Sequence, residues 1–137
     1  MDKKSEVYAK HRKARISPKK VVPVMDLIRG KSIHDAKVTL AFDTSKAAKM
    51  VLKVLKSAEA NAQNNNKLDV TQMYVSEAWV GAGAMAKWYL FKGRGRVSPI
   101  LKRTSHICLG ISTIPGTPKK VKKSNTAGKK VTKGGKK

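Results

Sequence analysis

Residues 70–111 read VTQMYVSEAWVGAGAMAKWYLFKGRGRVSPILKRTSHICLGI, and they decide the fold of this chain. Residues 70–75 are β-prone, and apolar residues alternate with polar or small ones over 106–111, so both ends predict strands. The chain between them has no helical pattern and contains glycine-rich runs at 81–84 and 93–96. Strands separated by so long a segment enclose either a disordered loop or an extended hairpin. We favour a hairpin, whose tip would lie about 50–60 Å from the sheet and whose order would come from a partner.

A strand and a first helix are expected near the start of the chain. Residues 7–16 have neither a helical stripe nor a turn residue, so they predict a basic edge strand. Ser17 and Pro18 then open a helix, because serine can cap a free N–H and proline at the first turn has no donor to leave unpaired. Gly30 can end this helix in the left-handed conformation, whereas Pro23 predicts a kink or a later start. The residues expected to face inward are Val21, Val24, Met25 and Ile28.

Two further helices follow. Residues 32–35 resemble a capping box that opens a short helix through about Phe42. Residues 45–64 carry apolar side chains at spacings of three and four, which predicts an amphipathic helix, and the asparagines at 64–66 end it. The inward residues are expected to be Ile33, Ala36, Leu40 and Ala41 in the shorter helix and Ala48, Val51, Leu55, Ala58 and Ala62 in the longer one.

The charge of the chain is strongly basic and graded. The first 77 residues hold sixteen bases and eight acids, a net of +8, so residues 78–137 supply the other +15 of the total +23 and contain no Asp or Glu. A domain of this charge repels itself unless a polyanion neutralises it, and nucleic acid rewards such a charge density directly. Residues 115–137 contain nine Lys and predict a tail that is disordered unless bound, with a solubilising or localising peptide as the alternative.

Other classes of protein find little support. No apolar stretch is long enough to cross a bilayer and no apolar leader opens the chain, so we expect a soluble, intracellular protein without membrane insertion. The single cysteine, Cys108, excludes an intramolecular disulfide and is typical of a small buried residue in a strand. The three histidines have no metal spacing, and Ser105 and His106 should point to opposite faces of a strand, so we expect no catalysis, metal or cofactor.

Nucleic-acid contact is best supported in the hairpin. Basic residues there lie among glycines and small side chains, so guanidinium groups and backbone amides can approach phosphates closely. Four aromatic residues occupy the same arm, where they either stack on exposed bases or pack across the hairpin and on neighbouring protein. These aromatic residues are Trp79, Trp88, Tyr89 and Phe91.

Three motifs together resemble one known family. SPKKV at 17–21, DLIRGK at 26–31 and above all GRVSPILKRTSHI at 95–107 are similar to the large-subunit ribosomal protein family numbered twenty-two in the bacterial scheme, in order from about residue 9 to 112. The resemblance implies a single α+β domain over 1–114, with three helices packed on a small three-stranded antiparallel sheet and a long hairpin at about 78–99. It also implies a structural role in the large subunit, in which the protein helps ribosomal RNA assemble and the hairpin tip lines the nascent-peptide exit tunnel.

The resemblance also implies where contacts fall. The expected partners are large-subunit ribosomal RNA, neighbouring ribosomal proteins and the nascent peptide at the tip, in a cytoplasmic ribosome. A nucleoid-type architectural DNA-binding protein is the alternative, supported by the Lys-rich tail alone. The residues expected to bind RNA are Arg12, Arg15, Lys19, Lys20, Lys92, Arg94, Arg96, Lys102, Arg103, His106, Lys119 and Lys120, and those expected at the hairpin tip are Met85, Lys87 and Trp88.

Overall fold

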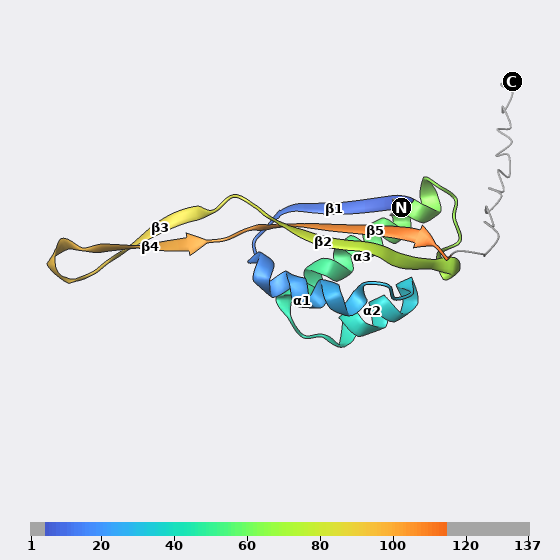
Figure 1. Ribbon diagram of the computed structural model, residues 1–137, viewed down its shortest axis with the longest axis horizontal. Coiled ribbons are helices and arrows are strands. Elements are labelled where there is room, and N and C mark those ends of the chain that lie inside the picture. Colours follow the sequence, from blue (N-terminus) through green and yellow to red (C-terminus); the bar gives the residue numbers. More distant parts are fainter. Residues whose placement is uncertain (1–4, 115–137) are drawn as a thin grey trace, which may run out of the picture.

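The computed structural model describes residues 5–114 of the 137-residue chain. It is an α+β fold in which three helices pack on a three-stranded antiparallel sheet, and a two-stranded hairpin extends from one end (Figure 1). The elements are β1 (Val7–Ala14), α1 (Pro18–Ile28), α2 (Ile33–Phe42), α3 (Lys46–Asn64), the short 3-10 turn η1 (Val70–Gln72), β2 (Met73–Ala82), β3 (Ala86–Phe91), the turn η2 (Gly93–Gly95), β4 (Val97–Lys102) and β5 (Ser105–Thr113). The predicted fold class is confirmed.

The sheet has the order β1-β5-β2, so β5 is central and β1 is an edge strand, as its sequence predicts. The alternating residues Ile107, Leu109 and Ile111 are buried in the core. Cys108, one residue out of phase with them, points to the opposite face and is also buried. Residues 70–72, expected in a strand, form η1 instead, and β2 begins at Met73.

The helices follow the apolar pattern with two corrections. Helix α1 begins at Pro18, so the later start that Pro23 suggested is wrong, and Pro23 lies exposed inside the helix. Gly30 has φ +76°, which confirms the left-handed stop. In α2, Ala41 was expected inward but is exposed, because the core side of this short helix is completed by Ile33, Ala36 and Leu40.

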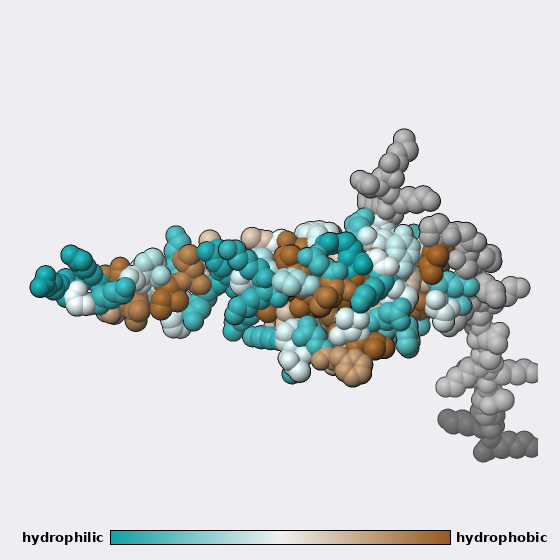
Figure 2. All heavy atoms as spheres, turned by 60° about the horizontal axis from the view of Figure 1, so that its bottom comes forward, coloured by the Kyte–Doolittle hydropathy of each residue, from teal (hydrophilic) through white to brown (hydrophobic). Residues whose placement is uncertain are grey.

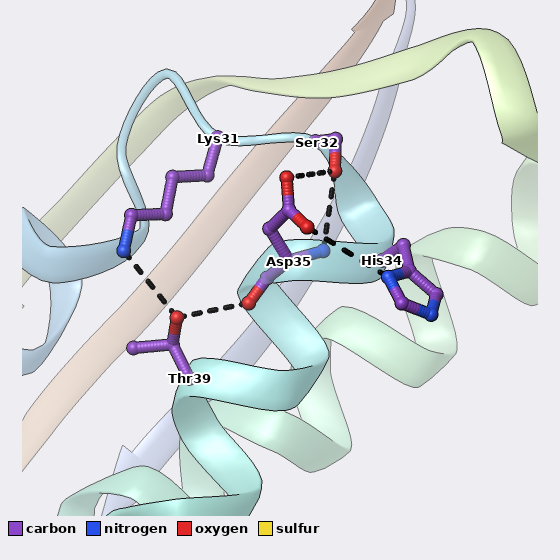
Figure 3. Close-up of polar contacts among 5 residues, drawn as sticks. All are labelled: Lys31, Ser32, His34, Asp35 and Thr39. Atoms are coloured by element: carbon purple, nitrogen blue, oxygen red, sulfur yellow. Dashed lines mark hydrogen bonds and ion pairs between the residues drawn. The ribbon is translucent and has the colours of Figure 1, made fainter.

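The start of α2 is capped as its sequence predicts (Figure 3). The Ser32 Oγ accepts a hydrogen bond from the backbone N–H of Asp35 at 3.1 Å and donates one to the Asp35 carboxylate at 2.8 Å. One turn later the Thr39 hydroxyl donates to the Asp35 carbonyl at 2.9 Å and accepts from the Lys31 ammonium at 3.3 Å. The bond from the Asp35 N–H satisfies a donor that has no partner within the helix.

The starts of α3 and α1 allow a test of capping, in which α1 is the control. Ser45 accepts a hydrogen bond from the Ala48 N–H at 3.1 Å at the start of α3. The Ser17 side chain makes no capping bond at α1, so the cap expected there from the sequence is wrong. Ser45→Ala should therefore lower the free energy of unfolding by about 1 kcal/mol, and Ser17→Ala by much less. Urea unfolding of both variants measures the difference. Equal losses would mean that the Ser45 cap contributes nothing specific.

The hairpin leaves the sheet where β2 and β5 stop pairing. The last sheet pair is Ala82 with Ser105, after which the Gly83 N–H donates to the Thr104 carbonyl at 2.9 Å. A β-carbon at Gly83 would collide with the Thr104 hydroxyl, so this crossing needs glycine. Strands β3 and β4 then pair from Ala86 with Lys102 to Phe91 with Val97.

The hairpin differs from the expected one in its bounds and in its apex. Residues 78–82, assigned to the hairpin from the sequence, belong to the sheet, and the free hairpin spans 83–104. Its turn lies at residues 92–96, closed by the Lys92 N–H donating to the Arg96 carbonyl at 2.8 Å. Met85, Lys87 and Trp88 lie in its base and first strand, so the expected apex is wrong.

The Lys-rich tail expected at 115–137, with Lys119 and Lys120, lies outside the described residues, and the division of the chain at residue 114 stays a prediction. None of the helices within residues 5–114 combines the length and apolar character needed to cross a membrane.

Candidate nucleic-acid interface

Basic side chains gather at three places, which we name the outer pocket, the basal groove and the hairpin loop. The outer pocket has a volume of about 370 Å³. The residues that line it are Lys10, Arg12, Lys13, Trp79, Gly81, His106, Ile107 and Cys108. Most of them project from β1, β5 and β2 on the side opposite the buried alternating residues, so the pocket lies on the sheet face that the helices leave open.

The sheet register builds the outer pocket. Lys10, Cys108 and Trp79 lie in one row across the three strands, and Gly81 pairs with His106 in another row on the same face. Cys108 is 1% exposed and forms the bottom, or floor, of the pocket, whereas Trp79 is 49% exposed and forms one of its sides. Burial raises the pKa of the Cys108 thiol above its ordinary value. The positive charge of Lys10 lowers this pKa and the negative charge of Glu77 raises it, and both effects are smaller than that of burial. The floor is therefore uncharged at neutral pH.

A bulge in β1 fixes the histidine of this pocket. The register shifts between His11 and Ala14, and Lys13 has φ +56°. As a result the Lys13 N–H points at His106 and donates to its Nδ1 at 3.1 Å. When the ring is neutral, acceptance at Nδ1 places the proton on Nε2, which can then donate to a ligand.

The basal groove, of about 740 Å³, lies between the base of the hairpin and the starts of two helices. Ser17, which precedes α1, and Lys46, the first residue of α3, both line it, and so does the exposed Trp88 of β3. Helix N-termini carry partial positive charge and favour anions, which adds to the cations of the groove. The other residues that line it are Arg15, Ile16, Lys20, Ala86, Leu101, Lys102, Arg103 and Thr104.

The hairpin loop places three cations at the far end of the ribbon. Lys92 and Arg96 close the turn, and Arg94 lies between them with φ +58°, a conformation that glycine adopts more easily. Figure 2 shows hydrophilic atoms at this end and hydrophobic ones along the arm. The tip is therefore basic and its flanks are apolar, whereas the residues that the sequence predicted at the tip, Met85, Lys87 and Trp88, include a single cation.

Among residues 5–114, no carboxylate forms an ion pair with a cation of the outer pocket, the basal groove or the hairpin loop. The hairpin, residues 83–104, contains no Asp or Glu. The ion pairs between residues 5–114 join Arg29 to Asp26 and Lys37 to Glu59, and also His34 to Asp35 when the imidazole is protonated, all on the helical side of the globular domain. The basic pockets and loop are thus left charged toward a partner.

The structure brings most of the expected RNA-binding residues together. Arg12 and His106 meet in the outer pocket, four others line the basal groove, and three form the hairpin loop, while Lys19 is exposed on α1 and lines neither cavity. Sequence reasoning missed Lys10, Lys13 and Lys46. Period-two alternation along residues 7–16 could have found Lys10, but Lys13 depends on the bulge and Lys46 on how α3 meets the hairpin. Their roles in binding stay proposals.

Ser105 and His106, which are adjacent in the sequence, do not form a catalytic pair. Ser105 is fully buried in the core, and its hydroxyl has no hydrogen-bond partner among the described residues, while His106 lies on the other face of β5. Within residues 5–114 no group of three or more His, Cys, Asp or Glu side chains is placed to hold a metal ion.

Comparison with known proteins gives the family. Residues 9–112 match the family described as ribosomal protein L22p/L17e. The chain is 44% identical over 110 residues to large ribosomal subunit protein uL22 of Lactobacillus delbrueckii subsp. bulgaricus, covering 80% of this chain and 94% of that protein. It is 47% identical over 95 residues to the same protein of Clostridium novyi, covering 69% and 86%. It is 46% identical over 108 residues to that of Lactobacillus gasseri, covering 79% and 92%. The chain therefore belongs to the ribosomal protein L22p/L17e family.

Proposed function

We propose that this chain is a structural component of the large ribosomal subunit, which anchors in ribosomal RNA through its outer pocket and basal groove and carries its hairpin loop to the nascent-peptide exit tunnel. The observation that carries the proposal is the hairpin itself. Residues 84–103 contain no buried side chain and no acid. An isolated two-stranded ribbon is at best marginally stable in water, so this one is suited to be covered by an anionic partner.

The basal groove supports RNA as that partner. Its arginines can hold phosphate oxygens in bidentate fashion, and two helix starts add favourable dipoles at the same place. Phosphate contacts of this kind position a protein without reading sequence. The groove would thus fix the direction in which the hairpin leaves the domain.

The ribbon offers apolar contact on both of its sides. Residues directly opposite in an antiparallel pair share a face, so Trp88 and Ile100 lie on one side and Phe91 and Val97 on the other. Trp88 is 62% and Phe91 80% exposed. Side chains of this type can stack on unpaired bases, which supports passage of the ribbon between RNA segments. They can equally pack on neighbouring ribosomal proteins, which we include among the partners.

Binding assays with the full chain test this function. We expect affinity for a transcript of large-subunit ribosomal RNA to fall steeply with salt, because each neutralised phosphate releases counterions. The chain should also sediment with the large subunit in a high-salt gradient. Release there together with equal or tighter binding to duplex DNA of the same length would instead favour a nucleoid protein.

The position of the hairpin loop gives a separate prediction about the tunnel. A photo-crosslinker attached to a cysteine at residue 94 should capture a stalled nascent chain in assembled ribosomes, because residue 94 lies in the turn. The same probe at residue 85, at the base of the hairpin, is the control and should capture mainly RNA or protein. Both variants need Cys108→Ser, although this thiol is buried. Capture of the nascent chain from residue 85 alone would contradict the proposed placement.

A further inference from the structure

We propose that the outer pocket binds one unstacked nucleobase of RNA against the Trp79 indole, with Arg12 and Lys13 holding the adjoining phosphates. The inference rests on the proposed function in that the RNA is ribosomal. It adds a defined base-binding site on the open face of the sheet, well away from the hairpin loop.

The shape of the outer pocket suits a single base. At about 370 Å³ it lies near the lower end of the roughly 300–1,000 Å³ that small-molecule sites occupy. Its floor is made of Gly81 and Cys108, the two smallest side chains in their rows, and Trp79 stands beside them. A duplex presents its bases already stacked, so a concave site with one aromatic wall fits an extruded base better.

Trp79 is exposed enough to stack on a ligand. Its indole is 49% exposed on a strand whose inward neighbours Ala78 and Val80 pack toward the core. A large aromatic side chain left half in water beside cations is typical of single-strand binding surfaces, where stacking tolerates any base. The Trp79 Cζ3 atom lies 3.6 Å from where a β-carbon at Gly81 would stand, so the ring borders the floor of the pocket, and its exposed half offers a surface on which a base can stack.

Polar groups surround the proposed base on the remaining sides. The His106 Nε2 can donate to a base or ribose oxygen, since its Nδ1 is occupied by the Lys13 N–H at 3.1 Å. Arg12 and Lys13 are exposed at the rim, and Lys10 extends over the Tyr8 ring at 6.0 Å from its centroid. The pocket therefore combines one stacking surface, one oriented donor and a cationic rim, which are the parts that a nucleotide requires.

Fluorescence of the full chain tests the site directly. The sequence has two tryptophans, so Trp88→Phe leaves Trp79 as the only indole. The probes are a single-stranded decamer of riboadenosine and an abasic ribose-phosphate decamer of equal charge. We expect the adenosine decamer to quench Trp79 fluorescence and the abasic decamer to leave it nearly unchanged, because only a base can stack.

Two substitutions and one conservative control then test whether the quenching arises in the outer pocket. Trp79→Ala should weaken binding of the adenosine decamer by about five- to 150-fold, the usual range for one stacked base, and leave abasic binding unchanged. Gly81→Val should abolish the quenching by filling the floor. It should still fold, because a β-carbon at Gly81 meets Trp79 and His106 at ordinary distances of 3.6 and 3.7 Å. Trp79→Phe is the conservative control and should retain most of the affinity.

The outcomes separate this inference from the proposed function. Salt-dependent binding of the ribosomal transcript together with equal effects of both decamers on Trp79 would overturn the base site and leave the proposed function standing. Unchanged quenching in Gly81→Val would also overturn it. Loss of binding to every RNA would remove the proposed function and the base site together.

Discussion

Replacement of residues 84–103 by Asn-Gly should leave the globular domain folded and markedly weaken its salt-dependent binding to large-subunit ribosomal RNA. The structure offers a clean point of excision, because the Gly83 N–H donates to the Thr104 carbonyl at 2.9 Å directly beyond the last sheet pair. Two strands in this register can be joined by a two-residue type I′ turn, for which Asn-Gly is the favoured sequence.

The domain should tolerate this excision because the hairpin contributes nothing to its core. Every residue of β3 is exposed, and β4 has one half-buried residue and none that is buried. We therefore expect the free energy of unfolding to change by less than about 1 kcal/mol, the scale of a few surface substitutions. Circular dichroism and urea unfolding of the shortened chain measure this.

Binding should respond very differently. The excision removes six cations and no acid, so the slope of log affinity against log salt should fall by about four to five, at roughly 0.7–0.9 for each phosphate that is no longer neutralised. Those cations are Lys87, Lys92, Arg94, Arg96, Lys102 and Arg103. The matched control keeps the ribbon and replaces the six by Gln, which separates charge from shape. A shortened chain that binds with unchanged slope would show that the globular domain alone carries the interaction.

The contrast between domain and hairpin also explains which features could be predicted from the sequence. Helix α3 and strand β5 bury a regular apolar pattern, and Gly30 ends α1 in the left-handed conformation, so local signals and tertiary structure agree. The hairpin has no buried side to impose a period. Its existence followed from the missing helical signal, but its apex did not.

The apex is fixed by pairing rather than by local composition. The run at residues 81–84 has the composition of a flexible tip, but Gly81 pairs with His106 inside the sheet. Since the last sheet pair joins Ala82 to Ser105, equal arms place the turn between residues 93 and 94, midway between 82 and 105. The Gly-Arg-Gly run there supplies the left-handed positions that the turn needs. Knowledge of the register would have moved the predicted tip from Trp88 to Arg94.

The outer pocket could not be predicted from the sequence, because it too depends on strand pairing. Its residues come from three strands that meet only through β5, and one of them, Lys13, depends on the bulge in β1. Trp79 is close in sequence to the aromatic residues of the hairpin, so sequence alone assigns it to the same arm. The sheet instead places it beside Lys10 and Cys108, on the body of the domain.

Leu109→Ala should be one of the most damaging single substitutions in this chain, with a loss of about 3–5 kcal/mol in the free energy of unfolding. Leu109 is fully buried in the central strand, and its row neighbours Ala9 and Ala78 are small, so neither of them can fill the space that it leaves. For a domain of about 110 residues, whose total stability is about 5–15 kcal/mol, this is a large share.

The matched control is Leu101→Ala, the same substitution in the hairpin, where the side chain is 40% exposed. It should cost less than about 1 kcal/mol, because little apolar surface is removed from the interior. Urea unfolding gives both values, and RNA binding measured below the transition of each variant gives the complement. Below its unfolding transition, the Leu109→Ala variant should bind RNA as tightly as the parent chain does, because the substitution alters no surface cation. Equal stability losses in the two variants would show that the ribbon has a core of its own, and would remove the argument that it is built to be ordered by RNA.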